Sequence, residues 1–329
     1  MIQIQRQENS AVTDYYLDVI ARMFDGEEVY DASHSLEECK KTDIIIAPTA
    51  TEFFRVYRHG FKKIVYWMQG IDGEESYLKH KSRIRKFILD FFTKFALKRA
   101  KAVFFVSEEM KRYEEEKFRL KLDDKSFIMP CFNVSEETGL FFDEEKYDKN
   151  VFAYVGSLSK WQCFSEIVDF YKRIEEKYDD TFLRVFTFEK EAAKQILKEK
   201  GIEKYSVDTV PPEKMTEALR MVKFGFVLRE NIAVNNVATP TKLSSYLSAG
   251  VIPIYSSCLV DFHKNTENMK YVIPVEESFE IPERLDEFIK NKLDCDAISA
   301  EYTALFDTYY NPMHYIESYR ERLQALFTK

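Results

Sequence analysis

The residues with the clearest chemical character lie in one loop, RENIAVNNVATPTKL, which starts at Arg229 and ends just after Lys242. A helix N-terminus carries roughly half a positive charge, so a lysine in the first turn opposes the helix dipole by about 0.3–1 kcal/mol. An anion held between Lys242 and Arg229 would remove that conflict. The loop therefore predicts an anion-binding site; the alternative is a solvated Lys242 and an Arg229 paired with Glu230 or another carboxylate.

The elements around this loop predict where the site lies. The runs FGFVL and VIPIY are typical of buried strands, and PTKLSSYLSA between them is typical of a helix. Thr239 is predicted to cap this helix, Pro240 to occupy its first turn, and Gly250 to follow its end with a positive φ. Right-handed crossover then places the loop at the carboxyl edge of a parallel sheet.

A second loop points to the same edge. In VFAYVGSLSKWQCF a strand runs into Gly156 and Ser157, and Lys160 follows before a helix. Gly156 would allow a diphosphate to approach the backbone, and Lys160 is close enough in sequence to reach it. Taken together, the two loops predict a positively charged pocket in the second half of the chain.

Strand-like and helix-like runs alternate along the whole chain, which is typical of parallel α/β units. We expect two doubly wound domains facing a cleft, with a polar connection at NVSEETGLFFDEEKYDKN. The predicted domains span residues 1–140 and 150–310, and residues 311–329 form a helix that returns to the first domain. The predicted strands are residues 2–4, 43–47, 63–67, 102–106, 127–129, 151–155, 182–186, 224–228, 251–255 and 271–274.

Composition excludes several classes of protein. The chain of 329 residues has a formal charge of −8 at pH 7, which argues against a general nucleic-acid binder. Its five cysteines include no CxxC pair, so neither a disulfide framework nor a zinc site is indicated. No apolar run approaches the roughly 20 residues that span a bilayer. We expect a cytoplasmic protein, dissolved or peripheral to the inner face of the membrane.

Three segments, YVGSLSKWQ, FGFVLRE and PTKLSSYLSAGVIPI, resemble in order and spacing the donor-binding domain of GT-B glycosyltransferases. The likeness is strongest to glycosyltransferase family 4 and its bacterial capsule and O-antigen relatives. KIVYWMQGIDGEES, AVFFVSEEMKRY and IMPCFNV look like the acceptor-binding domain of that family. The resemblance implies a nucleotide-diphosphate sugar bound by the second domain, an acceptor bound by the first, no tightly bound cofactor and no required metal.

The resemblance also implies roles for individual residues. Its donor-side residues in this chain are Gly156, Ser157, Lys160, Arg229, Glu230, Asn236, Thr241, Lys242, Ser245 and Tyr246. The family usually has a pair of glutamates where this chain has Val237 and Ser245, and an arginine where it has Ser157. Lys160 would compensate for that arginine, and Glu230 and Asn236 would supply polar groups to the sugar. On the acceptor side, Gln69 and Gly70 stand where the family often has a histidine.

The resemblance favours transfer with retention, in which Arg229, Lys242 and helix amides stabilise the leaving diphosphate and the acceptor proton passes to that phosphate. Gln69 joins these two as a candidate catalytic residue, and Gln69, Gly70 and Asp72 form the acceptor side. An inverting reaction would need a base, for which Asp72, Glu74 and Glu75 are candidates. Two further alternatives are a sugar-nucleotide epimerase of the same architecture and an inactive nucleotide- or glycan-binding partner.

Residues 79–101 combine many lysines and arginines with a stripe of phenylalanine and isoleucine, against the single acid Asp90. As a helix, this segment would have an apolar face with basic flanks, as in helices that lie on anionic membranes. The alternative is that the apolar face packs on the first domain and only the lysines are solvated.

Overall fold

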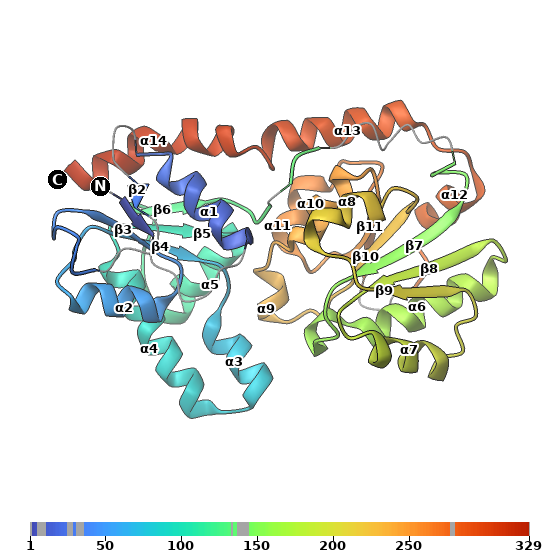
Figure 1. Ribbon diagram of the computed structural model, residues 1–329, viewed down its shortest axis with the longest axis horizontal. Helices are drawn as coiled ribbons and strands as arrows, with labels where there is room; N and C mark the ends of the chain where they lie inside the picture. The colour runs from blue at the N-terminus through green and yellow to red at the C-terminus, as the bar shows by residue number, and fades with distance from the viewer. Residues whose placement is uncertain are drawn as a thin grey trace. The chain divides into compact units, whose positions relative to one another are not determined.

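The computed structural model describes residues 2–4, 11–24, 29–30, 36–132, 134–136, 145–276 and 280–328. The chain divides into two compact units, each built on one parallel sheet with helices packed around it (Figure 1). Unit 1 contains Met1–Asn133, Asn236–Thr239 and Asn311–Lys329; unit 2 contains Val134–Asn235 and Pro240–Tyr310. Half of the predicted polar connection, including residues 137–144, lies outside the described residues.

The sheet of unit 1 has the order β2-β1-β3-β4-β5-β6, and every pairing is parallel. Its inner strands are almost wholly apolar because helices bury both faces of a parallel sheet. Every residue of β3, β4 and β5 is buried. The strands are β1 (Ile2–Ile4), β2 (Val29–Tyr30), β3 (Ile44–Ala47), β4 (Ile64–Met68), β5 (Ala102–Phe105) and β6 (Ser126–Ile128).

Polar caps set the starts of several helices in unit 1. Thr49, Ser82 and Ser107 each accept a hydrogen bond from the backbone of the following turn, as N-cap residues do. The helices are α1 (Ala11–Ala21), α2 (Ala50–Arg58), α3 (Asp72–His80), α4 (Arg83–Arg99), α5 (Glu108–Phe118) and α14 (Pro312–Thr328).

Helix α14 is part of unit 1. Its Tyr319 donates a hydrogen bond of 2.8 Å to the carbonyl of Ile128 at the end of β6. Farther along the helix, the ring of Phe327 packs edge-on against Phe24, with 5.2 Å between the ring centroids. These contacts attach the last helix to strand β6 and to the segment that follows α1.

The sheet of unit 2 has the order β12-β11-β10-β7-β8-β9, again with parallel pairing throughout. The strands are β7 (Asn150–Val155), β8 (Thr181–Phe186), β9 (Tyr205–Asp208), β10 (Phe224–Val227), β11 (Ile252–Ser256) and β12 (Ile273–Val275). The helices are α6 (Phe164–Lys177), α7 (Lys190–Glu199), α8 (Met215–Ala218), α9 (Ala233–Asn236), α10 (Thr241–Ser248), α11 (Val260–Thr266), α12 (Glu283–Lys290) and α13 (Cys295–Thr308), with 3-10 turns η2 (Lys160–Gln162) and η3 (Pro212–Lys214).

The predicted α/β class with two parallel sheets is confirmed. Each of the ten predicted strands has an observed counterpart, whereas β2 and β9 were not predicted. Gly250 follows α10 with φ of +67°, as expected for the residue past a helix end. None of the helices within the described residues combines the length and the apolarity needed to cross a bilayer.

Candidate active site

Arg229 is fixed at the carboxyl edge of the sheet in unit 2. It follows β10, and only 5% of its surface is exposed. Its backbone N–H donates to the hydroxyl of Ser256 at the end of β11, at 2.8 Å. One guanidinium nitrogen donates to the carbonyls of Leu228 at 2.8 Å and Gln162 at 3.2 Å. The guanidinium is therefore held in one place by backbone groups.

Gln162 joins Arg229 to Lys242. Its side-chain oxygen, Oε1, accepts a hydrogen bond of 2.6 Å from Nη2 of Arg229. The same oxygen accepts from Nζ of Lys242, in the first turn of α10. One neutral amide oxygen thus lies between two cations. Sequence reasoning did not select Gln162, because an isolated glutamine at the end of the KWQ turn carries no distinctive spacing.

No carboxylate within the described residues forms an ion pair with Arg229 or Lys242. Burial lowers the pKa of Arg229. Burial, together with the charge of Arg229, holds the pKa of Lys242 well below its usual range. The alternative in which Arg229 pairs with Glu230 is therefore wrong for the described residues. Two desolvated cations that repel one another are an arrangement that a bound anion would stabilise.

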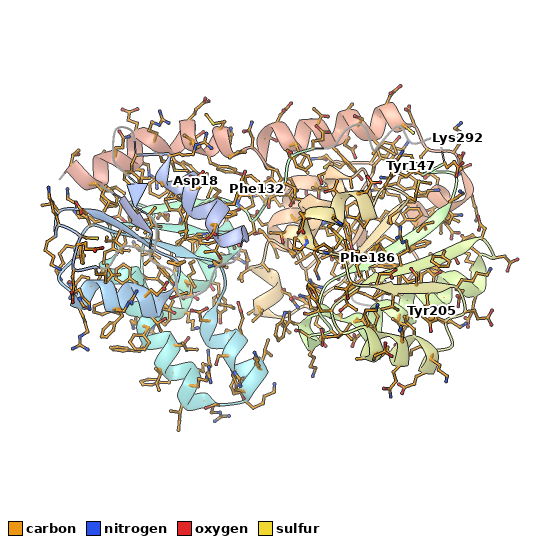
Figure 2. The ribbon with its side chains drawn as sticks, in the orientation of Figure 1. Asp18, Phe132, Tyr147, Phe186, Tyr205 and Lys292 are labelled. Atoms are coloured by element: carbon orange, nitrogen blue, oxygen red, sulfur yellow. The ribbon has the colours of Figure 1, made fainter. Side chains whose placement is uncertain are left out.

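Gly156 brings the other predicted loop to this pair. It follows β7 with φ of +144°, and its N–H donates to the carbonyl of Phe186, at 2.9 Å. Phe186 lies at the end of the neighbouring strand β8 (Figure 2). A β-carbon at position 156 would lie 2.3 Å from Nζ of Lys242. Glycine suits this position because its φ of +144° strains any other residue, and a side chain here would also displace the lysine ammonium.

The first turn of α10 differs from its prediction. The helix begins at Thr241 after Pro240, and no side chain caps it. The prediction that Thr239 is the N-cap is wrong, because its hydroxyl accepts instead from the backbone N–H of Cys131 at 2.9 Å, within unit 1. Among the described residues, no side-chain cap satisfies the first amides of α10, which leaves them available to an anion beside Lys242.

Other predicted donor-side residues of unit 2 lie near this pair in the fold without contacting it. Ser157 is exposed on the loop after β7, and Lys160 is exposed at the start of η2. The hydroxyl of Ser245 donates to the carbonyl of Thr241 at 3.1 Å, which is a bond inside α10. Tyr246 is fully buried, and its hydroxyl lies 3.4 Å from the carbonyl of Ala153. The Tyr246 ring therefore supports the site from the core side.

Glu230 and Asn236 are two further residues that were predicted for the donor side. Glu230 is exposed, and its carbonyl accepts a hydrogen bond of 2.9 Å from the side chain of Asn235. Asn236 is at the end of α9 and belongs to the segment Asn236–Thr239 of unit 1. The predicted contacts of Glu230 and Asn236 with a sugar remain predictions.

Unit 1 contains a polar pocket of about 320 Å³ at the carboxyl ends of β3 and β4. It brings together the three residues that were predicted for the acceptor side. The lining residues are Pro48, Thr49, Tyr66, Gln69, Gly70, Asp72 and Glu75. This lining includes two carboxylates and no lysine, arginine or histidine, so the pocket suits a neutral ligand rich in hydroxyl groups better than an anionic one.

The two carboxylates of this pocket have raised pKa values. Burial raises the pKa of Asp72, against a smaller opposing effect of the Lys117 charge. Burial also raises the pKa of Glu75, and the charge of Asp72 adds to that effect. Although Glu75 as a residue is exposed, its carboxylate lies against the backbone of Gly70. Either carboxylate can therefore accept a proton more readily than an ordinary acidic side chain.

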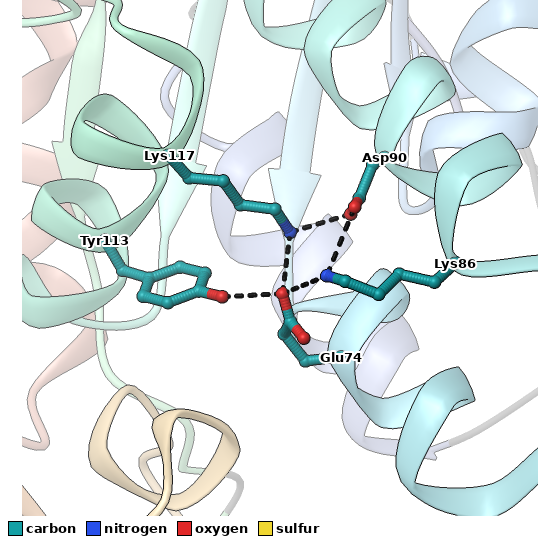
Figure 3. A network of polar contacts seen from close by, with 5 residues as sticks. All are labelled: Glu74, Lys86, Asp90, Tyr113 and Lys117. Carbon is teal, nitrogen blue, oxygen red and sulfur yellow. Dashed lines mark hydrogen bonds and ion pairs between the residues drawn. The ribbon is translucent and has the colours of Figure 1, made fainter. Parts of the chain in front are cut away.

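Glu74 differs from these two neighbours. It accepts hydrogen bonds from Lys86 and from the hydroxyl of Tyr113, the latter at 2.7 Å, and it pairs with Lys117 at 3.1 Å (Figure 3). Burial alone would raise the pKa of Glu74, but these partners lower it to about 2. A carboxylate held so firmly in its ionised form is a poor base, so Glu74 is a structural residue.

Across the part of the chain that the structure describes, no group of three or more His, Cys, Asp or Glu side chains is arranged to hold a metal ion. No protein-family profile matches the sequence, and no curated protein matches it significantly.

Solved structures, by contrast, match the fold over nearly the whole chain. HepE of Anabaena, solved in complex with UDP, matches with a TM-score of 0.67 and 13% identity, over 98% of this chain and 99% of HepE. A glycosyltransferase from Rickettsia africae matches with a TM-score of 0.65 and 10% identity, over 100% of this chain and 98% of that one.

A third match is a mutant of S. aureus TarM, solved with fondaparinux, alpha-GlcNAc-glycerol and UDP. Its TM-score is 0.61 and its identity 10%, over 88% of this chain and 56% of TarM. The chain therefore spans little more than half the length of TarM. These structural neighbours are GT-B glycosyltransferases, and the predicted GT-B fold of this chain is confirmed.

Proposed function

We propose that this protein is a glycosyltransferase that moves a sugar from a nucleotide-diphosphate sugar to a glycan or lipid-linked acceptor. The observation that carries the proposal is the pair Arg229 and Lys242, two desolvated cations that share one neutral amide oxygen and have no carboxylate partner among the described residues. A diphosphate supplies the charge that this pair lacks. The UDP complexes of HepE and TarM, which have the same fold, support this choice of ligand.

The donor side would work by stabilising the leaving group. Phosphate oxygens would take the place of Oε1 of Gln162 between Arg229 and Lys242, and the first amides of α10 would donate to the same diphosphate. Negative charge grows on the diphosphate as the bond to the sugar breaks. Because the cations are already in place in a desolvated setting, their effect on the transition state is large.

The acceptor side would lie in the pocket that contains Gln69, Gly70 and Asp72. The amide of Gln69 can orient an acceptor hydroxyl, and we assign it a catalytic role on that ground. We propose transfer with retention, in which the acceptor proton passes to the departing phosphate. Transfer with inversion would instead use Asp72 or Glu75 as the base, which their raised pKa values permit. The anomeric configuration of the product, read by NMR, distinguishes the two.

We place the product in a bacterial surface polysaccharide of the capsule or O-antigen type, on the sequence resemblance alone. The enzyme would act in the cytoplasm or at the inner face of the membrane. Since Arg229 and Lys242 supply positive charge beside the diphosphate, we expect transfer to continue in the presence of EDTA.

The first test is a thermal-shift screen of UDP, GDP and CMP, followed by turnover of the corresponding nucleotide sugars. We expect one nucleoside diphosphate to raise the melting temperature, since a ligand that binds only the folded state stabilises it. The matching sugar donor should then be consumed with release of that diphosphate. Binding without turnover would favour the inactive-partner alternative, and an altered sugar still joined to its nucleotide would favour an epimerase. Absence of stabilisation by every nucleotide would contradict the proposal.

A further inference from the structure

Helix α4 exposes a stripe of large apolar side chains. Ile84, Phe87, Ile88 and Phe91 are 76%, 72%, 47% and 54% exposed. At about 100° per residue these four positions fall within an arc of about 100° on one face of the helix. Elsewhere in the described residues, exposed large apolar side chains occur singly, as Phe182, Phe188, Val260 and Met313. A contiguous apolar stripe of this kind marks an interaction surface.

The same stripe is covered at its C-terminal end. Phe95 packs edge-on against Phe54 and Tyr57 of α2, with ring centroids 5.2 and 5.1 Å apart. Phe92 packs against Phe54 at 4.9 Å. Figure 1 shows α4 continuing past α2 toward its hairpin with α3. The alternative that the apolar face only packs on its own domain therefore holds for one end of α4 and is wrong for the other.

The exposed end is held rigidly. Lys86 and Lys117 join Glu74 of α3 to Asp90 of α4, with Lys117 at 2.7 Å from the Asp90 carboxylate (Figure 3). Gly73 allows this approach, because a β-carbon there would lie 2.1 Å from the Asp90 carboxylate. The hairpin of α3 and α4 thus presents the stripe as a fixed surface.

Cations surround the stripe without carboxylate partners. By helical geometry, Arg83 and Arg85 fall on opposite sides of it. The exposed basic residues of the hairpin that form no ion pair within the described part of the chain are Lys79, Lys81, Arg83, Arg85, Lys94, Lys98 and Arg99. Lys86 is different, since Glu74 and Asp90 neutralise it. The surface is therefore apolar along its centre and positively charged along its edges.

We propose that this surface docks on an anionic lipid bilayer, with α4 lying in the interface and its exposed apolar stripe inserted at the boundary of the acyl chains. An apolar centre with basic edges matches both layers of such a surface. A second copy of this chain is a poor occupant, because its own basic edges would face these. A nucleic acid has no counterpart for the apolar centre. The inference goes beyond sugar transfer and does not rest on it.

The test is cosedimentation of the purified chain with phosphatidylcholine vesicles that contain or lack phosphatidylglycerol. We expect binding only when phosphatidylglycerol is present, with weaker binding as salt is added. Absence of binding to the anionic vesicles at low salt would overturn the proposal.

Substitutions distinguish the contribution of the apolar stripe from that of the flanking basic residues. The double substitution Phe87→Ser, Phe91→Ser should weaken vesicle binding by at least about tenfold, because two apolar side chains lose their burial in lipid. Removing the flanking charges with Arg83→Gln and Arg85→Gln should cost about fivefold for each residue. The matched control is Phe188→Ser, which removes a phenylalanine that is 80% exposed in unit 2 and should leave vesicle binding unchanged.

Three readouts keep the outcomes distinct. Vesicle binding that the double variant retains in full would overturn the proposal. A native chain that is dimeric and becomes monomeric in the double variant, measured by light scattering, would identify the stripe as a contact between copies and would also overturn it. Nucleotide-induced thermal stabilisation should be the same in native and double-variant protein, so failure of the sugar-transfer proposal leaves this test interpretable.

Discussion

Two clusters of charge in this molecule are built in opposite ways. In unit 1, Lys86 and Lys117 meet Glu74 and Asp90, and each cation has both carboxylates within 3.2 Å. In unit 2, Arg229 and Lys242 meet one amide oxygen of Gln162. Their electrostatic consequences are also opposite, since the partners of Glu74 lower its pKa to about 2, whereas burial and Arg229 hold the pKa of Lys242 well below its usual range.

The difference separates a structural cluster from a binding cluster. The paired network favours the charged forms of Glu74 and Lys117 and so contributes to the stability of the hairpin. In unit 2, the surroundings of Arg229 and Lys242 disfavour the charged form of each, so the pair is unfavourable without a ligand. The fold nevertheless retains both residues. Such an arrangement is expected where binding, rather than stability, determines the residues.

The largest expected effect is that of Lys242→Ala on catalysis. We expect kcat to fall on the order of 100-fold to 1,000-fold, about 2.7–4 kcal/mol, as for the loss of one oxyanion-hole donor. The free energy of unfolding without ligand should stay the same or increase, because the variant removes a desolvated charge that Arg229 repels. Steady-state kinetics with the identified donor and urea unfolding measure the two quantities.

The matched control is Lys86→Ala in the paired network. It leaves two partly buried carboxylates with one cation fewer, so the free energy of unfolding should decrease by about 1–3 kcal/mol. Below the melting temperature, kcat with a water-soluble acceptor should be unchanged. If Lys242→Ala were the destabilised variant and Lys86→Ala the inactive one, the assignment of the two clusters would be reversed.

Sequence patterns predicted the fold well because most strands are continuous apolar runs, such as IIIA in β3 and FGFV in β10. They missed β9, whose YSVD sequence lies at the sheet edge with only Val207 buried, and the two-residue β2. Edge strands need no continuous apolar pattern, because only part of each one is covered.

The site was partly accessible to the same reasoning. Lys242 could be selected because a cation in a first helical turn conflicts with the helix dipole. Gln162 could not, because its role depends on a 3-10 turn that carries its amide to Arg229. Ser245 has the right spacing for a ligand, yet its hydroxyl bonds within α10. Likewise, the sequence of α4 could not show that α2 covers only one end of its apolar stripe.

A second prediction concerns the pKa of Glu114, a buried carboxylate beside the paired network. Glu114 is 1% exposed, and neither of its carboxylate oxygens has a hydrogen-bond partner within the described residues. Burial raises its pKa to about 7; Lys117 opposes the shift, while Asp90 and Glu74 add to it. The pKa in the unfolded chain is about 4.3. The folded state therefore binds more protons between these values, and this group reduces the free energy of unfolding as pH rises through that window.

The variant Glu114→Gln removes this pH dependence. Above the folded pKa of about 7, its free energy of unfolding should exceed that of the native chain by up to about 4 kcal/mol, since each pKa unit corresponds to about 1.4 kcal/mol. Near pH 4 the two should be similar, because native Glu114 is then protonated. Urea unfolding over this pH range measures the difference. Equal pH slopes for the two proteins would show that Glu114 is not the group responsible.

The smallest expected effect is the uptake of protons by Lys242 when a diphosphate binds. If a diphosphate binds beside Lys242, its charge must raise the pKa that burial and Arg229 hold down. At pH values between the pKa of Lys242 in the unbound protein and its pKa in the complex, Lys242 is partly neutral before binding and charged afterwards. Binding therefore takes up a fraction of a proton, and the affinity for the diphosphate decreases as pH rises through this range. Calorimetry in buffers of different ionisation enthalpy, repeated over a series of pH values above the second ionisation of phosphate near 6, measures the uptake. Lys242→Ala should abolish the uptake, whereas Lys86→Ala should keep it because Lys86 belongs to the paired network of unit 1 and not to the diphosphate site. Binding with no proton uptake in the native chain would mean that the diphosphate lies away from Lys242. The interpretation of Arg229 and Lys242 as a binding cluster would then be wrong.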